Sequence, residues 1–450
     1  MRSAAFAGSR RNHLFRLWGE VVSGVELPQL DRWLADNFRK NARYGSRDRR
    51  WYSEMLFAAV RHGYLALFCE FAESRGARSF NELCELFLKE FPNAAAVLDA
   101  WRTSSPELFF ARVWAAYEGS FQQVDELPCS REIWETTAVS SVLVQLKEFA
   151  QQGDARAQML LASVPLWLWD PLMRRSSASS WDPSVLSSFL KAQTTRPPLW
   201  VRVNHPDKTD HVVHTLCQEG YVVQNVEGAL SVSGERGIFL SDVYKQGLIE
   251  IQDFASQKAG ASVQARPGDV VWDACAGGGG KTLQIASRLQ NKGAVYASDV
   301  REFKLEEVKK RARRAGFFNV RCEPWDGVAL PSFPREVEKR GGFDWVLVDA
   351  PCSSSGTWRR NPDAKYRIGE SSVAEISALQ KSILSNAARA VGAKGNLVYS
   401  TCSWLVDENE DVVRAFLSEN PSFHLLEMRL LGSPCANSDT LFSAVLARRP

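Results

Sequence analysis

From Gly268 onward, short apolar runs alternate with longer amphipathic runs. The clearest apolar run is 343–349, which ends at Asp349 and is followed by a turn that contains Pro351. A short apolar run bounded by turn residues is typical of a strand buried on both faces of a parallel sheet. Because such strands alternate with helices, the sequence predicts a doubly wound α/β fold with a parallel sheet.

The alternation predicts a specific set of elements. Strands are expected at 269–273, 294–299, 319–323, 343–349 and 395–401. Helices are expected at 281–289, 304–315, 373–391 and 408–419, with a last antiparallel strand at 441–446. The helix 304–315 has one apolar stripe, and its face rich in Lys and Arg is expected to be solvated.

Two cysteines follow predicted strands. Cys352 comes three residues after Asp349, and Cys402 comes directly after the run that ends at Thr401. Because the carboxyl ends of parallel strands form the ligand-binding edge of such sheets, we expect both thiols and the carboxylate at one edge. A lone buried cysteine is usually inert, but two thiols beside a ligand pocket indicate chemistry by a thiolate nucleophile.

A glycine-rich turn, Gly277 to Gly280, separates a predicted strand from a predicted helix. Four glycines allow a ligand to approach the backbone closely. A phosphate-binding loop would require glycine at position 275, which is Cys275, and a dinucleotide fingerprint would require a third glycine at 282 or 283. The turn therefore predicts neither of these motifs.

Four acidic residues lie at or just after the ends of predicted strands: Asp273, Asp299, Asp326 and Asp349. A carboxylate at the position of Asp299 is suited to accept hydrogen bonds from ribose hydroxyls. Because carboxylates repel phosphate, a nucleoside without a pyrophosphate fits this set better than a dinucleotide. The cationic sulfonium of S-adenosylmethionine makes it the predicted ligand, although carboxylates at such positions also cap helices.

Thiols and carboxylates together predict methylation of a pyrimidine. A thiolate that adds to carbon 6 of the ring makes carbon 5 electron-rich enough to take a methyl group. Asp349, if protonated or sharing a proton, is suited to hydrogen-bond ring nitrogen 3. A second thiol could assist proton removal or release of the adduct, and these residues alone leave open which cysteine attacks.

Several segments resemble the signature motifs of the Sun/NOP (RsmB-type) family of S-adenosylmethionine-dependent RNA cytosine-5 methyltransferases. They are 247–257, 273–282, 349–357, 360–363, 400–403 and 407–410. The resemblance runs from about residue 197 to the C-terminus and implies a class I (Rossmann-like) methyltransferase domain. It assigns the nucleophile to Cys402 and resolution of the adduct to Cys352, with Asp349 and Lys281 also expected to be catalytic.

The same resemblance implies the contacts to S-adenosylmethionine. The backbone contacts carry over to Cys275, Ala276, Gly277, Gly278, Gly279, Gly280 and Lys281. Asp299 is expected at the ribose, Asp326 near the adenine, and Asp349 between cofactor and base. The family commonly has Pro-Gly-Gly where this chain has Gly278-Gly279-Gly280, a change that loosens the turn but keeps its amides.

Residues from about 12 to 150 have the apolar spacing of helices. Helices are expected at 30–38, from an N-cap at Ser46, at 80–91 and 105–117, and at 134–151 as the last long one. Up to His62 there are twelve Lys or Arg and six Asp or Glu. That excess suits a surface that faces RNA phosphates, or equally a solvated helical face.

The helical region resembles the NusB-like RNA-binding domain of bacterial rRNA methyltransferases, best at 30–38 and 45–49. This resemblance implies that the partner is 16S rRNA or a small-subunit precursor. The target base would have to be unpaired or flipped out to reach a thiol in a pocket. Alternatives are a tRNA cytosine-5 methyltransferase with the same chemistry, or a non-catalytic RNA-binding ribosome assembly factor.

Composition changes near Ser163, and a serine-rich break is expected at 176–180. A small α/β module follows, with strands at 197–204, 221–226 and 230–232 and a helix at 208–219. We therefore predict a helical NusB-like domain at 1–155, a linker and small RNA-recognition subdomain at 156–240, and the methyltransferase domain at 241–450. Basic residues between aromatic ones at 197–204 suit either RNA contact or simple packing.

The nine cysteines are scattered, odd in number and without CxxC spacing. This pattern supports neither a disulfide framework nor a metal site and favours a reducing, cytoplasmic compartment. The first residues lack the apolar core of a signal peptide, and no run of 18 apolar residues suggests a membrane span. A monomer is expected.

Overall fold

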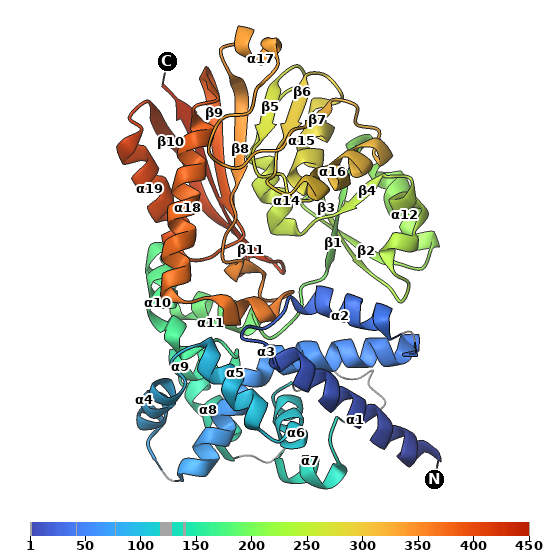
Figure 1. Ribbon diagram of the computed structural model, residues 1–450, viewed down its shortest axis with the longest axis vertical. Coiled ribbons are helices and arrows are strands. Elements are labelled where there is room, and N and C mark those ends of the chain that lie inside the picture. The colour runs from blue at the N-terminus through green and yellow to red at the C-terminus, as the bar shows by residue number, and fades with distance from the viewer. Residues whose placement is uncertain (1, 42, 77, 118–127, 138–140, 450) are drawn as a thin grey trace. The chain divides into compact units, whose positions relative to one another are not determined.

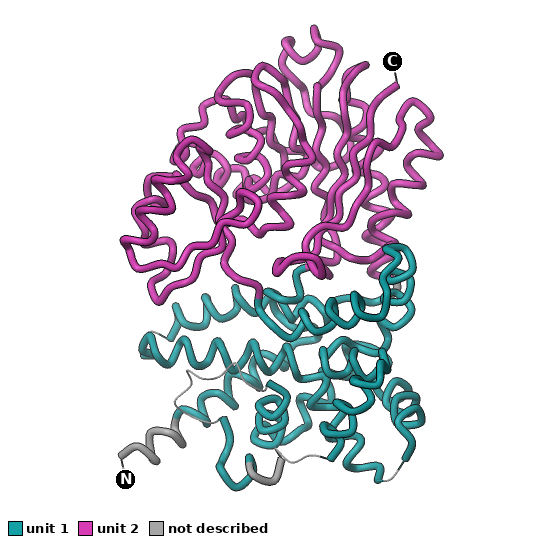
Figure 2. The backbone as a smooth tube through the Cα atoms, turned by 180° about the vertical axis from the view of Figure 1, so that it is seen from behind, with its two compact units in different colours: residues 1–196, 357–369 teal, residues 197–356, 370–450 magenta. Residues whose placement is uncertain are grey.

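The computed structural model describes residues 2–41, 43–76, 78–117, 128–137 and 141–449. The chain forms two compact units: unit 1 comprises 1–196 and 357–369, and unit 2 comprises 197–356 and 370–450 (Figure 2). The limits of these units differ from the predicted domain limits at 155 and 240. The small α/β module lies in the same unit as the large sheet, and the helical unit extends some 40 residues further than expected.

Unit 1 is helical (Figure 1). Its α-helices are α1 (Arg2–Val22), α2 (Leu30–Lys40), α3 (Ser46–Arg75), α4 (Phe80–Glu90), α5 (Ala94–Thr103), α6 (Pro106–Ala116), α7 (Arg131–Thr137), α8 (Ser141–Gln151), α9 (Ala155–Leu161), α10 (Trp169–Ala178) and α11 (Pro183–Ala192). The predicted helices at 30–38, 80–91 and 105–117 are confirmed as α2, α4 and α6.

Three details of this region were predicted wrongly. The segment 134–151 contains the end of α7 and all of α8, with 138–140 outside the described residues, and it is not the last long helix. The serine-rich break at 176–180 begins inside α10, because Ser176 and Ser177 remain helical. The N-cap of α3 is Gly45, and Ser46 is the first helical residue.

Helix α3 is the central element of unit 1. It is 30 residues long and apolar enough to meet the length and composition criteria for a membrane span, but 89% of that window is buried inside the protein. The core helix of a globular unit has the same composition.

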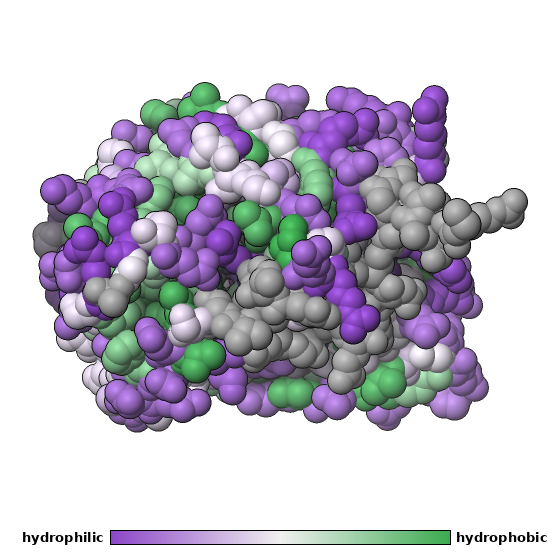
Figure 3. Space-filling model, turned by 90° about the horizontal axis from the view of Figure 1, so that it is seen from below, coloured by the Kyte–Doolittle hydropathy of each residue, from purple (hydrophilic) through white to green (hydrophobic). Residues whose placement is uncertain are grey.

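On the face drawn in Figure 3, hydrophobic residues are scattered among hydrophilic ones rather than gathered in one patch.

The segment 357–369 is an insertion from the sequence of unit 2 that packs within unit 1. It includes a 3₁₀ helix at Pro362–Arg367. The buried ammonium of Lys365 donates to the carbonyls of Arg61 (3.0 Å) and Ser163 (2.9 Å). The hydroxyl of Tyr366, also buried, donates to the carbonyl of Val60 (3.2 Å). The insertion is thus fastened to the backbone of α3.

Unit 2 contains two sheets (Figure 1). The smaller one is antiparallel in the order β2-β3-β1-β4, with β1 (Leu199–Val203), β2 (Val222–Val226), β3 (Ala229–Ser233) and β4 (Ile249–Ile251). Helix α12 (Thr209–Gln218) covers one face, where its Val212 and Leu216 pack with Val201. The predicted small α/β module is confirmed in its strands and its helix.

The larger sheet has seven strands in the order β10-β11-β9-β8-β5-β6-β7. These are β5 (Val270–Asp273), β6 (Ala294–Ala297), β7 (Val320–Cys322), β8 (Phe343–Asp349), β9 (Val391–Thr401), β10 (Phe423–Gly432) and β11 (Thr440–Arg448). Strands β5 to β9 pair in parallel, and β10 and β11 complete one edge in antiparallel pairing. The predicted α/β fold and the predicted strands are confirmed.

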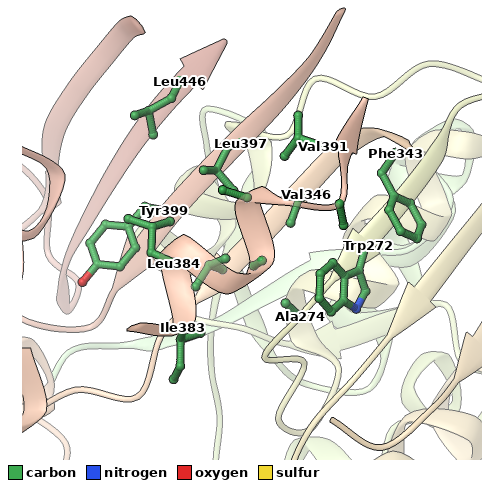
Figure 4. Close-up of a cluster of buried hydrophobic side chains, with 14 of the residues drawn as sticks. Trp272, Ala274, Phe343, Val346, Ile383, Leu384, Val391, Leu397, Tyr399 and Leu446 are labelled. Atoms are coloured by element: carbon green, nitrogen blue, oxygen red, sulfur yellow. The ribbon is translucent and has the colours of Figure 1, made fainter. Parts of the chain in front are cut away.

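The α-helices of unit 2 other than α12 are α13 (Asp242–Lys245), α14 (Phe254–Ala261), α15 (Gly280–Leu289), α16 (Glu302–Arg314), α17 (Arg335–Lys339), α18 (Glu370–Ala388) and α19 (Glu410–Glu419). Trp272 on β5 and Phe343 on β8 stack in the core between sheet and helices, with ring centroids 5.9 Å apart (Figure 4). Burial of such large rings contributes strongly to stability. The sheet therefore offers a rigid frame for the loops at its edge.

Candidate active site

The two thiols predicted to meet lie in contact. Sγ of Cys352 is 3.1 Å from Sγ of Cys402. The strand register explains this contact, because Asp349, at the end of β8, lies opposite Ser400 of β9. Cys352 and Cys402 follow these two residues by three and two positions, so both thiols leave the same edge of the sheet. The prediction that one edge presents both thiols is thus correct in its geometry.

The two thiols have different proton affinities. The hydrogen bond with Cys352 lowers the pKa of Cys402, although burial opposes this effect. The same hydrogen bond and burial raise the pKa of Cys352 well above its ordinary value. Oγ of Ser354 lies 3.5 Å from Sγ of Cys402 and also favours the thiolate. The arrangement therefore favours the thiolate at Cys402 over the thiolate at Cys352.

An ion pair lies beside the thiols. Nζ of Lys281, at the start of α15, donates to Oδ2 of Asp349 across 2.8 Å. Burial alone would lower the pKa of Lys281, but the charge and hydrogen bond of Asp349 raise it. The positive charge of Lys281 also acts to lower the pKa of Cys402. Four predicted catalytic residues thus form one cluster at the point where the strand order reverses between β5 and β8.

The loops that carry the thiols are joined by buried hydrogen bonds. Oγ of Ser355 lies 2.8 Å from Oγ of Ser403, and the amide of Gly356 donates to the carbonyl of Cys402 across 2.9 Å. A Cβ at Gly356 would stand 1.7 Å from the carbonyl oxygen of Thr440, so only glycine fits this close approach. These contacts hold the two loops at a fixed separation.

The glycine-rich turn follows β5. Gly277 and Gly279 have φ of +51° and +86°, which glycine adopts without strain. The amide of Gly277 donates to Oδ2 of Asp299 across 3.0 Å, so the turn and the loop after β6 lie together. Burial would raise the pKa of Asp299, but hydrogen bonds from Arg301 and Gly277 lower it. The turn leaves open space where a side chain at Gly277 would stand.

Asp326 and Cys275 complete the predicted set. The side chain of Asp326 is exposed and accepts from the amide of Val328 (2.9 Å). Its neighbour Trp325 donates its amide to the carbonyl of Asp299 (3.3 Å), so the loops after β6 and β7 run side by side. Burial, followed by the charges of Asp273, Asp349 and Asp299, raises the pKa of Cys275 well above its ordinary value. Cys275 is thus close enough to Asp349 and Asp299 for the charge of each to act on its thiol.

Two residues of this region had no assigned role in the predicted site: Asp273 was predicted only as one of the strand-end carboxylates, and Arg311 only as part of a solvated helix face. Asp273, fully buried at the end of β5, accepts from the hydroxyl of Thr282 across 2.6 Å. Burial raises its pKa to about 7. Arg311 donates to the carbonyl of Gly278 and to the buried carboxylate of Glu250 (2.8 Å). The basic face of α16 is therefore not simply solvated, because Arg311 supports the glycine-rich turn.

A second feature of unit 2 is a cavity of about 850 Å³, which none of the predicted site residues lines. It lies among Arg202, His205, Lys258 and Arg288. The cluster around Cys402 is thus separate from this cavity.

Within the described residues there is no group of three or more His, Cys, Asp or Glu side chains arranged to hold a metal ion.

Comparison with known families identifies the domain that carries this cluster. Residues 261–441 match the model of the family described as 16S rRNA methyltransferase RsmB/F. This segment belongs to the RsmB/F family. The matched segment contains both cysteines, the glycine-rich turn and all four carboxylates of the predicted site.

Curated relatives of the RsmB/F segment come from bacteria. Over 191 residues the chain is 38% identical to the probable ribosomal RNA small subunit methyltransferase B of Bacillus subtilis, covering 42% of each chain. Over 298 residues it is 28% identical to the ribosomal RNA small subunit methyltransferase B of Klebsiella pneumoniae, covering 65% of this chain and 66% of the relative. The chain matches less than two thirds of the length of either relative.

Solved structures share the fold. The crystal structure of PH0851 has a TM-score of 0.63 and 23% identity, covering 92% of this chain and 93% of its own. The structure of NSun6 from Pyrococcus horikoshii with SFG has a TM-score of 0.53 and 16% identity, covering 62% of this chain and 98% of its own. At these identities the likeness concerns the fold alone.

Proposed function

We propose that this protein is an S-adenosylmethionine-dependent RNA (cytosine-5)-methyltransferase that acts on 16S rRNA or a small-subunit precursor. The membership of residues 261–441 in the RsmB/F family supports methylation of rRNA. The names of the Bacillus and Klebsiella relatives, both rRNA small subunit methyltransferases, point to the same substrate class.

The donor site is assigned to the turn Cys275 to Lys281 with Asp299, Asp326 and Asp349. The positive φ of Gly277 and the open space above it suit close approach of a ligand to the backbone. Asp299 is positioned to accept from ribose hydroxyls once Arg301, whose side chain is 51% exposed, turns outward. When bound there, S-adenosylmethionine supplies a methyl group on a cationic sulfur, which nearby carboxylates attract.

The catalytic roles follow the family resemblance. The thiolate of Cys402 adds to carbon 6 of cytosine, a step that raises the electron density at carbon 5, the atom that receives the methyl group. Asp349, held by Lys281, hydrogen-bonds ring nitrogen 3 in this assignment, with the shared proton lying between them. Release of the adduct removes the proton from carbon 5 and breaks the bond between carbon 6 and the Cys402 sulfur, and Cys352, which lies next to that sulfur, is assigned to assist this step.

The observation that carries this proposal is the 3.1 Å contact between the two sulfur atoms, beside the Lys281–Asp349 ion pair. A binding protein without catalysis has no need of a thiolate held beside a second thiol. The choice of Cys402 as nucleophile follows the family resemblance, and the downward direction of its pKa shift supports that choice.

The test uses 16S rRNA and labelled S-adenosylmethionine with three variants. Cys402→Ala should abolish transfer of the methyl group, and Cys352→Ala should accumulate a covalent protein–RNA adduct. Cys217→Ala, which removes an exposed thiol, is the matched control and should behave as the unaltered protein. Normal methylation by Cys402→Ala would refute the role given to that residue.

The same assay separates the competing substrates. Transfer to tRNA but not to 16S rRNA would favour a tRNA methyltransferase with identical chemistry. Binding of RNA with neither transfer nor an adduct would favour an assembly factor. Bisulfite mapping of rRNA from cells that lack the protein would locate the modified cytosine. The cytoplasmic location, the monomeric state and RNA contact by unit 1 stay predictions.

A further inference from the structure

One buried carboxylate touches both thiol-bearing loops. Glu408, at the end of a 3₁₀ helix (Val406–Glu408), has 0% exposure. Its Oε2 accepts from the amide of Ser353 (2.8 Å) and from Nε2 of Gln380 (3.0 Å). Its Oε1 accepts from the hydroxyl of Ser403 (2.9 Å). Three donors therefore converge on one side chain.

The positions of these donors in the sequence give the contacts their meaning. Ser353 directly follows Cys352, and Ser403 directly follows Cys402. Gln380 of α18 also donates to the carbonyl of Pro351 (2.9 Å), the residue before Cys352. This network thus contacts the backbone of Pro351 and Ser353, on either side of Cys352. It also contacts the side chain of Ser403, which follows Cys402.

We propose that Glu408 is the positioning residue that sets the spacing and the division of labour of the two thiols. It does not touch substrate in this assignment but acts through the two serines. The methylation readout rests on the proposed function, whereas the effect on the thiols themselves does not.

A carboxylate is chemically suited to this role where an amide is not. A carboxylate offers only acceptors, and three donors occupy three of its four lone-pair sites. A glutamine in its place would turn an NH₂ group toward at least one of these donors, leaving a buried polar group unsatisfied. Burying a charge is costly unless hydrogen bonds compensate it, and here three donors do so.

The charge of Glu408 also distinguishes the two thiols. After the hydrogen bond with Cys402 and burial, the negative charge of Glu408 is a further cause of the raised pKa of Cys352. A Cys352 that stays protonated can donate its hydrogen to the Cys402 sulfur. The carboxylate therefore acts on Cys402 indirectly, by keeping its neighbour a donor.

The test compares Glu408→Gln and Glu408→Asp with Glu419→Gln, which neutralises an exposed carboxylate at the end of α19. Two readouts are used: kcat and KM for methylation of 16S rRNA, and the rate of alkylation of each cysteine by iodoacetamide against pH, without RNA or donor. Mass spectrometry of peptides assigns each alkylation to Cys352 or Cys402.

For Glu408→Gln we expect kcat to fall roughly 100-fold, as for a small misplacement of reacting groups, with KM nearly unchanged. Alkylation of Cys352 should begin at lower pH, because the repelling charge is gone. Glu408→Asp keeps the charge but shortens the reach, so kcat should fall while the pH profile of Cys352 stays in place. Glu419→Gln should match the unaltered protein in both assays.

Kinetics and alkylation profiles of Glu408→Gln equal to those of Glu419→Gln would overturn the proposal. If circular dichroism shows that Glu408→Gln does not fold, Glu408→Asp carries the test, and normal kcat in that variant would overturn it. Loss of the proposed function would look different. In that case even the unaltered protein would not methylate 16S rRNA, while the alkylation profiles would still report on Glu408.

Discussion

Asp349 lies directly opposite Ser400 in the parallel pairing of β8 with β9. This single register relationship brings Cys352 and Cys402 to the same point, with their sulfur atoms 3.1 Å apart. A shift of one residue would turn each side chain to the other face of the sheet and separate the thiols. The closeness of the two sulfurs has a direct chemical consequence.

We expect hydrogen peroxide to join Cys352 and Cys402 in a disulfide. The Cys402 thiolate attacks the peroxide to give a sulfenic acid and hydroxide, and the Cys352 thiol then displaces water. Methylation should stop after peroxide treatment and return fully after dithiothreitol, with a peptide linking both cysteines detected by mass spectrometry. In Cys352→Ala the sulfenic acid of Cys402 has no resolving thiol, so excess peroxide should carry it on to the sulfinic acid, which dithiothreitol does not reduce. Mass spectrometry should find this oxidised Cys402 after the reductant, and recovery of the unoxidised thiol would contradict the assignment.

Lys281→Met should reduce methylation by roughly 100-fold, the range expected for a group that supports acid–base chemistry. Its ammonium pairs with Asp349 across 2.8 Å and acts to lower the pKa of Cys402. Without it the pKa of Cys402 rises, so alkylation of this thiol should require higher pH. Lys292→Met, at an exposed position, is the control. An unshifted alkylation profile in Lys281→Met would argue against this electrostatic role.

Asp273→Asn should stabilise the protein at neutral and alkaline pH. Burial raises the pKa of Asp273 from 3.8 to about 7, so the folded state holds a proton that the unfolded state loses above pH 4. Stability therefore falls as pH rises from about 4 to about 7, by up to about 4 kcal/mol in this linkage. Denaturant titrations at several pH values should show a gap between the two proteins that grows with pH and closes near pH 4.

Arg311→Gln should weaken binding of S-adenosylmethionine, because Arg311 supports the carbonyl of Gly278 and neutralises buried Glu250. Arg314 remains paired with Glu250, so we expect the free energy of unfolding to fall by about 1–3 kcal/mol rather than more. Calorimetry would measure the affinity. Lys310→Gln, on the exposed face of α16, should leave it unchanged, and equal affinities in both variants would exclude the supporting role.

Gly356→Ala should destabilise the protein by about 1–3 kcal/mol, the usual cost of overpacking, because the added Cβ would overlap the carbonyl of Thr440. Gly237→Ala is the matched control, since a Cβ there meets no atom within 4 Å. Thermal unfolding measures the difference. Equal unfolding midpoints for the two variants would contradict this prediction. They would mean that the loop between Cys352 and α18 moves enough to accept the added Cβ without loss of stability.

The sequence was sufficient to predict the strands and most helices of the large sheet. The run 343–349 matches β8 residue for residue, because a buried parallel strand is mainly apolar and turn residues mark its end. It was equally sufficient to place Cys352 and Cys402 after strands. That their sulfurs touch depended on the register between β8 and β9, which residue pattern does not encode.

Glu408 and Arg311 show why other site residues escaped prediction. The run 407–410 resembles a family motif, but the role of Glu408 depends on donors at 353, 380 and 403, which only the folded chain brings together. Arg311 sits in a run of basic residues that looks like a solvated helix face. Its role depends on Glu250, 61 residues earlier. Helices α10 and α11 were missed because serine and proline in this stretch suggested a break.

The insertion at 357–369 limits how this protein can be divided. A fragment starting at residue 197 would retain the insertion but lose Val60, Arg61 and Ser163, whose carbonyls receive the hydrogens of Tyr366 and Lys365. The side chains of Lys365 and Tyr366, which are buried in the full chain, would then be exposed to water on a segment without packing partners. Expression of residues 197–450 alone should therefore yield misfolded or aggregated protein unless residues 357–369 are replaced by a short polar linker.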